Sequence, residues 1–144
     1  MPSFLVKAEC TEETQQRLMD KLQHYLDPMQ IDGSQHFYCT LILAKTWTKE
    51  PRLTQYPVKY TYLVKDIALF GYAIVLILDT GSTSFIAQRH YQLKEEMQAT
   101  TYYSTYIPHV TIGYSTCYPN LETLKKEFVG MSISLDYESG ISTE

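Results

Sequence analysis

The sequence predicts an α+β fold in which two β-α-β units form the two lobes of one domain. Short segments that alternate in polarity, as strands do, flank two segments with the apolar spacing of helices. The two units also match in spacing, because Val6 precedes Tyr38 by 32 residues and Leu76 precedes His109 by 33. A chain of 144 residues is long enough for one hydrophobic core. We therefore expect a single domain over 1–144, with lobes of roughly 1–66 and 67–144 whose antiparallel sheets line a central cleft.

The predicted elements follow from local signals along the chain. Thr11 is a typical N-cap before acidic residues, Pro28 is a stop signal, and Asn120 caps a short last helix. The turn at Phe70-Gly71 joins two strands in a hairpin. The predicted strands are 3–9, 36–44, 58–66, 72–79, 109–114 and 131–137, and the predicted helices are 11–27, 83–98 and about 120–128.

Alternation along two of these strands sorts their side chains onto opposite faces. In 36–44 the apolar face is Phe37, Cys39, Leu41 and Leu43, and the other face is His36, Tyr38, Thr40 and Ile42. In 109–114 one face is Val110, Ile112 and Tyr114, and the other is His109, Thr111 and Gly113. In the helix 83–98 the buried stripe is Ile86, His90, Leu93 and Met97, so we interpret His90 as structural.

Composition excludes several classes of protein. The formal charge of −4 argues against a long nucleic acid as a partner, because binding of DNA or RNA usually needs a broad basic face. The longest apolar run, 73–78, is too short to span a bilayer. Three cysteines without metal-ligand spacing, and an N-terminus unlike a signal peptide, lead us to expect a cytoplasmic protein without a metal.

The polar pairs Tyr38/Thr40 and His109/Thr111 are suited to a phosphodiester. Two threonine hydroxyls can donate hydrogen bonds to its non-bridging oxygens. An imidazole can accept a proton from an attacking hydroxyl, or protonate a leaving oxygen, because imidazole titrates near neutral pH. This chemistry requires neither a metal nor another cofactor.

These segments resemble those of a known superfamily. The segment "PHVTIGY" is similar to the second His-x-Thr segment of the two-histidine phosphoesterases. Within that superfamily, "FYCTLIL", "LFGYAIVLILD" and "ATTYYSTYIPHVTIGYS" look most like the bacteriophage anti-CBASS cyclic-nucleotide nucleases. The resemblance implies a bilobal α+β fold and cleavage of cyclic di- or trinucleotide immune signals in the cytosol of the infected bacterium. It implies that His109 is a general acid or base, and that Thr40 and Thr111 hold the phosphate.

The chain departs from that family pattern at Tyr38, which stands where the first histidine is expected. A phenol, with an ordinary pKa of about 10, is not a base at pH 7, although it can donate a proton or a hydrogen bond. His36 lies on the same predicted face, displaced by about 6–7 Å along the strand. It could replace the missing histidine only if the ligand or the strand shifted.

Three hypotheses about function follow. The first is a binding protein that sequesters a cyclic nucleotide, and the second is a phosphodiesterase that uses His109 with Tyr38 or His36. The third is an interaction domain that has only the fold. For ligand binding we single out Tyr38, Thr40, His109, Thr111, Trp47, Tyr106 and Lys7; Phe70, Tyr102 and Tyr103 are further candidates for stacking on a base, and Lys45 and Lys65 for offsetting charge. The base, the ring size and the oligomeric state stay open.

Overall fold

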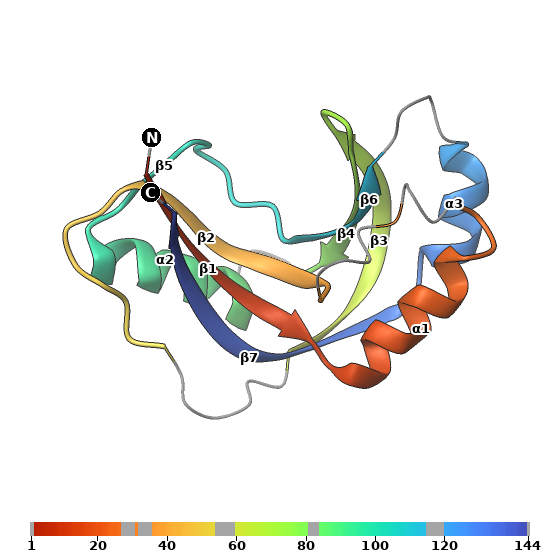
Figure 1. Ribbon diagram of the computed structural model, residues 1–144, viewed down its shortest axis with the longest axis horizontal. Coiled ribbons are helices and arrows are strands. Elements are labelled where there is room, and N and C mark those ends of the chain that lie inside the picture. Colours follow the sequence, from red (N-terminus) through yellow and green to blue (C-terminus); the bar gives the residue numbers. More distant parts are fainter. Residues whose placement is uncertain are drawn as a thin grey trace.

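The computed structural model describes residues 2–26, 31, 36–53, 60–80, 84–114 and 120–143. Figure 1 shows the elements in this part of the chain. The helices are α1 (Glu12–Leu22), α2 (Phe85–Met97) and α3 (Leu121–Phe128). The strands are β1 (Ser3–Cys10), β2 (Tyr38–Thr46), β3 (Tyr60–Phe70), β4 (Ala73–Asp79), β5 (Thr100–Thr101), β6 (His109–Tyr114) and β7 (Ser132–Thr143).

Helices α1 and α3 begin where the sequence predicts. The Thr11 side chain accepts a hydrogen bond from the backbone N–H of Thr14, and the Asn120 side chain accepts one from Thr123. Ser84 caps α2 in the same way, through the N–H of Ala87. Three predicted ends are wrong by one to five residues: α1 ends at Leu22 rather than 27, and α2 spans 85–97 rather than 83–98. The expected stop at Pro28 lies outside the described residues.

The strands form one seven-stranded sheet in the order β1-β7-β3-β4-β6-β2-β5. All its pairs are antiparallel, and β1 also pairs with β2, so the hydrogen-bonding circuit from β1 through β7, β3, β4, β6 and β2 closes. The α+β class is therefore confirmed. In place of the separate sheets that we expected, the sheet is continuous, and a division into two lobes around a cleft stays a prediction.

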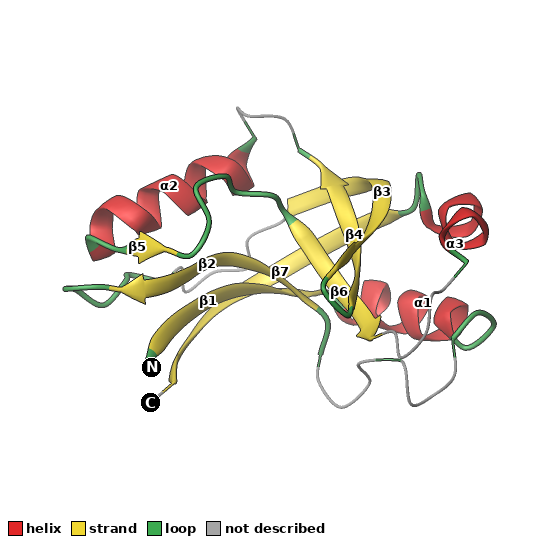
Figure 2. Ribbon diagram, turned by 90° about the horizontal axis from the view of Figure 1, so that it is seen from above, coloured by secondary structure: helices red, strands yellow, loops and turns green. Residues whose placement is uncertain are grey.

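A hairpin turn and the pairing of the two terminal strands complete the sheet. Gly71, at φ 63°, makes the predicted hairpin turn between β3 and β4, because a glycine adopts positive φ without strain. Pairing of Ser3 with Thr143 brings the two ends of the described chain side by side, as Figures 1 and 2 show. β7 is longer than the predicted strand 131–137 because it continues along β1 after leaving β3.

A β-bulge in β2 changes the predicted alternation of this strand. Val6 of β1 pairs with Ile42 and Lys7 pairs with Thr40, so Leu41 is the extra residue. Ile42 is consequently buried at 1% exposure, whereas Leu43 is exposed at 39%. The predicted faces are right up to Leu41 and wrong after it, because an extra residue reverses the alternation.

A second bulge has the same effect in β6. Ile74 of β4 pairs with Gly113 and Val75 pairs with Thr111, so Ile112 is the extra residue. Tyr114 pairs with Ala73 and therefore shares a face with Thr111, not with Val110 as the alternation predicts. Tyr114 is accordingly exposed while Ile112 is buried.

One continuous core underlies the sheet. α2 lies at one end of the molecule and α1 and α3 lie at the other, as Figure 2 shows from above. Each helix contributes apolar side chains to the same core: Leu18 and Leu22 from α1, Ile86, Leu93 and Met97 from α2, and Leu124 and Phe128 from α3. His90, the fourth residue of the predicted α2 stripe, is also buried. The predicted buried stripe of α2 is therefore confirmed.

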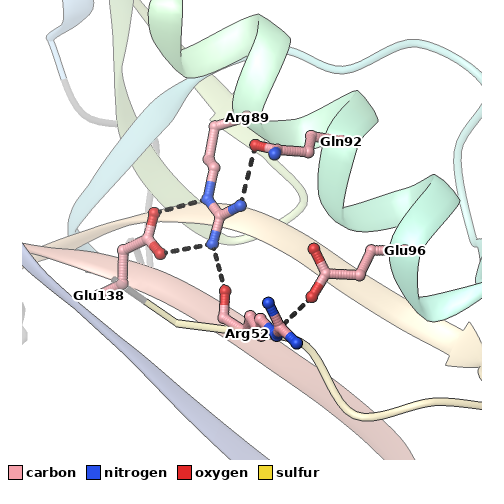
Figure 3. A network of polar contacts seen from close by, with 5 residues as sticks. All are labelled: Arg52, Arg89, Gln92, Glu96 and Glu138. Atoms are coloured by element: carbon pink, nitrogen blue, oxygen red, sulfur yellow. Dashed lines mark hydrogen bonds and ion pairs between the residues drawn. The ribbon is translucent and has the colours of Figure 1, made fainter. Parts of the chain in front are cut away.

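A buried ion pair fastens α2 to the sheet, as Figure 3 shows. The Arg89 guanidinium donates to both carboxylate oxygens of Glu138 on β7, at 2.8 Å each. It also donates to the Arg52 carbonyl at 2.6 Å and to the Gln92 side chain at 2.9 Å. Glu96 of α2 accepts from the Arg52 backbone N–H. This network ties one helix, one strand and the segment after β2 together.

Candidate functional site

Four polar side chains gather where β2 meets β6. Cys39 pairs with Val110, and both side chains are fully buried in the core. The residues on either side of this pair therefore point to the opposite face of the sheet. Antiparallel pairing puts Thr40 beside His109 and Tyr38 beside Thr111, and all four are partly exposed. We call these four residues the polar quartet: Tyr38, Thr40, His109 and Thr111.

The His109 imidazole is held in one orientation. Its Nδ1 lies 2.8 Å from the carbonyl oxygen of Ile107. A carbonyl only accepts hydrogen bonds, so Nδ1 carries the proton and donates. The neutral ring then has its lone pair on Nε2, where it can accept a proton. The edge-to-face contact with the Phe70 ring, at 4.9 Å between centroids, restrains the ring further.

Lys7 supplies a positive charge next to the quartet. It pairs in register with Thr40, and its ammonium nitrogen lies 4.6 Å from the centroid of the Tyr38 ring. The Lys7 side chain is 13% exposed, and its nitrogen lies 3.8 Å from a carboxylate oxygen of Glu9. Glu9 is itself the register partner of Tyr38 and was not singled out from the sequence. Its spacing of two residues from Lys7 on a strand could have indicated it.

Two buried apolar side chains lie beside the quartet on its own face of the sheet. Val75 and Ile77 of β4 pair with Thr111 and His109 and so share their face. They are buried at 0% and 9% exposure, yet neither belongs to the main core cluster. Apolar side chains therefore flank the quartet, and such surroundings strengthen its electrostatic interactions.

His36 does not join the quartet. Its Nε2 lies 2.5 Å from the carbonyl oxygen of Cys10, and its Nδ1 lies 3.9 Å from a carboxylate oxygen of Glu12. The next residue, Phe37, donates its backbone N–H to the Gln15 side chain. Both ring nitrogens of His36 thus face the corner where β1 passes into α1.

Tyr106 supports β2 from the core face, where its hydroxyl lies 3.9 Å from the buried Cys39 thiol. The hydroxyl donates to the backbone carbonyl of Thr40 at 2.8 Å. Its ring stacks on the His90 ring, with centroids 4.1 Å apart. His90 Nδ1 in turn lies 2.6 Å from the carbonyl of Leu41, as befits the structural role we predicted. Burial raises the pKa of Tyr106 well above its usual value and lowers that of His90.

Trp47 lies away from the quartet. It follows the end of β2 that is opposite Tyr38, and its ring packs edge-on against Phe4, 5.6 Å between centroids. Phe4 is a buried core residue near the start of β1. The structure thus brings together Tyr38, Thr40, His109, Thr111 and Lys7. It leaves Trp47, His36 and the Tyr106 hydroxyl outside this group.

Tyr114 is a further residue that sequence reasoning missed. It shares the face of Thr111 because of the bulge at Ile112, and it is 49% exposed. No signal in the sequence indicated this position, since bulges depend on pairing with a neighbouring strand.

Metal and thiol chemistry find no support in the described part of the chain. No group of three histidine, cysteine or acidic side chains there is placed to hold a metal ion. Burial raises the pKa of both the Cys10 and the Cys39 thiols to about 12, which keeps them protonated at neutral pH. The remaining groups of the site are hydroxyls, one imidazole, one ammonium and the Glu9 carboxylate beside that ammonium. The first three kinds of group suit hydrogen bonding to an anion and proton transfer.

Fold and site together define an α+β protein with a polar sheet face next to a partly buried lysine. A family model described as "Anti-CBASS protein Acb1" matches residues 3–141. This match covers nearly the whole chain, so the chain belongs to the Acb1 anti-CBASS family. It is accordingly an immune-evasion protein of the phage type, directed against CBASS. No curated protein matches the chain. Among the described residues, no helix is long and apolar enough to cross a membrane.

Proposed function

We propose that this protein binds a cyclic oligonucleotide signal of CBASS at the polar quartet and sequesters it. The observation that carries the proposal is the pairing of β2 with β6. It puts two threonines, one oriented imidazole and one phenol on a single face. Membership of an anti-CBASS family supports a ligand from CBASS signalling.

The ligand class follows from the chemistry of these groups. Thr40 and Thr111 can each donate a hydrogen bond to a non-bridging phosphate oxygen. Lys7 stands in register with Thr40 and offsets the charge of a phosphodiester. The net charge of the chain is −4, so attraction to the anion depends on such local cations. A small phosphodiester fits this arrangement better than a long nucleic acid.

Sequestration rather than rapid cleavage follows from the resemblance to two-histidine phosphoesterases. In that resemblance Tyr38 stands where the first histidine is expected. The resemblance also implies two lobes around a cleft. Losing one acid or base partner typically slows such a reaction by about 10²–10⁴-fold. His36 does not compensate, because both its ring nitrogens face Cys10 and Glu12. The phenol can still donate a hydrogen bond to a phosphate.

The alternative is a metal-independent phosphodiesterase. The orientation of His109 favours it, since Nε2 is the nitrogen left to accept a proton. In this mechanism Nε2 removes the proton from a ribose hydroxyl, the oxygen attacks phosphorus, and the phenol of Tyr38 protonates the leaving oxygen. Thr40 and Thr111 stabilise the negative charge that develops on the non-bridging oxygens.

One experiment separates the two functions. The protein is incubated with cyclic di- and trinucleotides and with cyclic ADP-ribose isomers, then denatured, and the released nucleotides are chromatographed. Release of the intact compound supports sequestration, and linear products support the phosphodiesterase. If none of these compounds is retained or altered, both functions are wrong. The remaining hypothesis is then an interaction domain. His109→Ala tests the site, and His24→Ala in the exposed turn after α1 is the matched control.

A further inference from the structure

Ser139 on β7 is a buried hydroxyl with an unexplained environment. Its Oγ is buried and has no hydrogen-bond partner among the described residues. Such groups are rare, because a buried hydroxyl without a partner loses the hydrogen bonds it makes in water. A water or a ligand usually explains them. The position of Ser139 indicates which ligand.

Ser139 is the register partner of Lys7, and Lys7 is also the register partner of Thr40. Residues directly opposite one another on paired strands share a face. Thr40, Lys7 and Ser139 therefore form a row across β2, β1 and β7. His109 of β6 extends the row, because antiparallel pairing sets it beside Thr40.

This row is longer than one phosphate group. With about 4.8 Å between neighbouring strands, four side chains on four strands span roughly 14 Å. Charge-assisted hydrogen bonds to a phosphate are only about 2.7–2.9 Å long. A phosphate next to His109 and Thr40 therefore cannot also bond Ser139. The Ser139 end needs an acceptor of its own.

The neighbours of Lys7 indicate the charge of this acceptor. The Lys7 side chain is only 13% exposed. In the structure Glu9 and the Tyr38 ring are its partners, at 3.8 Å and 4.6 Å. The Glu9 side chain is 40% exposed and can turn to solvent when another anion binds Lys7. Lysine is flexible, so its ammonium can move onto an anion that lies beside Ser139, its register partner.

Apolar side chains bound the row on its other side. Leu5 of β1 pairs with Leu43 on β2 and with Ile141 on β7. Leu43 and Ile141 are exposed, at 39% and 47%. The side chains of Leu5, Leu43 and Ile141 offer no hydrogen-bond donor to an anion at Lys7. Such an anion therefore stays next to the hydroxyls of Thr40 and Ser139.

We propose that Lys7 and Ser139 form a second phosphate subsite, so that the ligand has two phosphodiester groups held along one row. The first phosphodiester lies between His109, Thr40 and Thr111. The second accepts hydrogen bonds from the Lys7 ammonium and the Ser139 hydroxyl. This inference rests on the proposed function, and it states which ligands that function selects.

The test compares ligands with one and with two or more phosphodiesters. Calorimetry measures the binding of cyclic AMP and cyclic GMP, each with one phosphodiester. It also measures cyclic di-AMP, cyclic di-GMP, cyclic GMP–AMP and cyclic tri-AMP. We expect Ser139→Ala to weaken the larger ligands by about 3- to 10-fold, as for one lost hydrogen bond, and not to change binding of the mononucleotides. Lys7→Met has a larger effect of the same kind. Thr111→Val weakens both classes.

Matched variants control for effects outside the site. Ser134→Ala removes a serine hydroxyl from the same strand, one that contacts Thr61 instead, and Lys126→Met removes an exposed lysine of α3. Neither should change any affinity. Ser139→Ala should also leave the thermal midpoint unchanged or higher, because it removes a buried group without a partner. A lower midpoint would show that the hydroxyl is already paired.

The outcomes distinguish this inference from the proposed function. If Ser139→Ala weakens cyclic mononucleotides as much as the larger ligands, or weakens neither, the second subsite is wrong and the quartet still binds. If the wild-type protein binds none of the six compounds, the proposed function is wrong and the subsite is overturned with it.

Discussion

Cys39 and Val110 form the one residue pair that joins β2 to β6 within the described residues. Both side chains point into the core, so their neighbours along each strand must point away from it. The polar quartet exists because of this pair. Residues far apart in the sequence, Thr40 and His109, become neighbours on one surface. The same pair also completes the closed circuit of strands.

Under the sequestration that we propose, replacing Tyr38 by histidine should create a weak phosphodiesterase. The imidazole supplies a second proton-transfer group at the position where the resemblance to two-histidine phosphoesterases places the first histidine, and we expect turnover to rise about 10²-fold or more. Chromatography of linear products from a cyclic dinucleotide measures this change. Tyr38→Phe is the control, and it should keep the rate at the wild-type level. If the wild-type protein already cleaves the cyclic dinucleotide rapidly and Tyr38→Phe abolishes this cleavage, Tyr38 is the general acid and sequestration is wrong.

His36→Ala should affect stability and not turnover or binding. The variant loses the hydrogen bond from the ring to the Cys10 carbonyl, which is worth about 1 kcal/mol of unfolding free energy. Urea denaturation measures this loss, and the nucleotide assay measures activity on the same sample. A loss of turnover in the folded variant would instead assign catalysis to His36.

The Arg89–Glu138 pair should dominate the stability of the contact between α2 and β7. Arg89→Met leaves the Glu138 carboxylate buried without its bidentate partner. Such a change costs about 3–5 kcal/mol of unfolding free energy. The double variant R89M/E138L removes both charges, and it should recover most of that loss. The urea midpoints of the two variants measure these changes in unfolding free energy. Equal midpoints for wild type and Arg89→Met would contradict the importance of the ion pair.

His90 should make the protein sensitive to acid. Burial lowers its pKa in the folded state, so the unfolded chain takes up a proton first as the pH falls. The unfolding free energy therefore decreases from about pH 7 downward through the ordinary imidazole pKa of about 6.5. The decrease ends once the pH is below the folded pKa. Urea midpoints at pH 5 to 8 should show a shallower slope for His90→Gln than for wild type or His24→Gln.

The thiols of Cys10 and Cys39 should be inert in the folded protein. Both are at most 2% exposed, and burial raises the pKa of each to about 12. At pH 8 iodoacetamide should modify them only as fast as the chain unfolds, because the thiolate is the reactive form. Mass spectrometry of peptides after timed labelling measures this protection. Rapid labelling of either residue without denaturant would contradict the burial of that thiol.

Local chemistry made much of this fold predictable from the sequence. Thr11 and Asn120 cap their helices because side-chain oxygens satisfy free backbone N–H groups within the same turn. The apolar stripe of α2 and the hairpin at Gly71 also depend only on residues close in sequence. The choice of His109, Thr111, Tyr38 and Thr40 as one group came from alternation along two strands.

Tertiary pairing decided everything that depends on a partner strand. The bulges at Leu41 and Ile112 reversed the faces of Leu43 and Tyr114, because bulges arise from the register between strands. The hydrogen bonds of His36 and Tyr106 were equally hidden, since their partners are carbonyl groups distant in sequence.

The sequence by itself determined the class of fold, its helices, its strands other than β5, and the residue types that can hold a phosphodiester. These properties follow from alternation, helical spacing and side-chain chemistry, which act over a few residues. Only the tertiary structure decided that Lys7 lies over Tyr38, that Nε2 of His109 is the nitrogen left to react, and that Ser139 continues the row. Each of these depends on which strands are neighbours and in which register. The closure of the whole sheet sets that register, and no single segment encodes it.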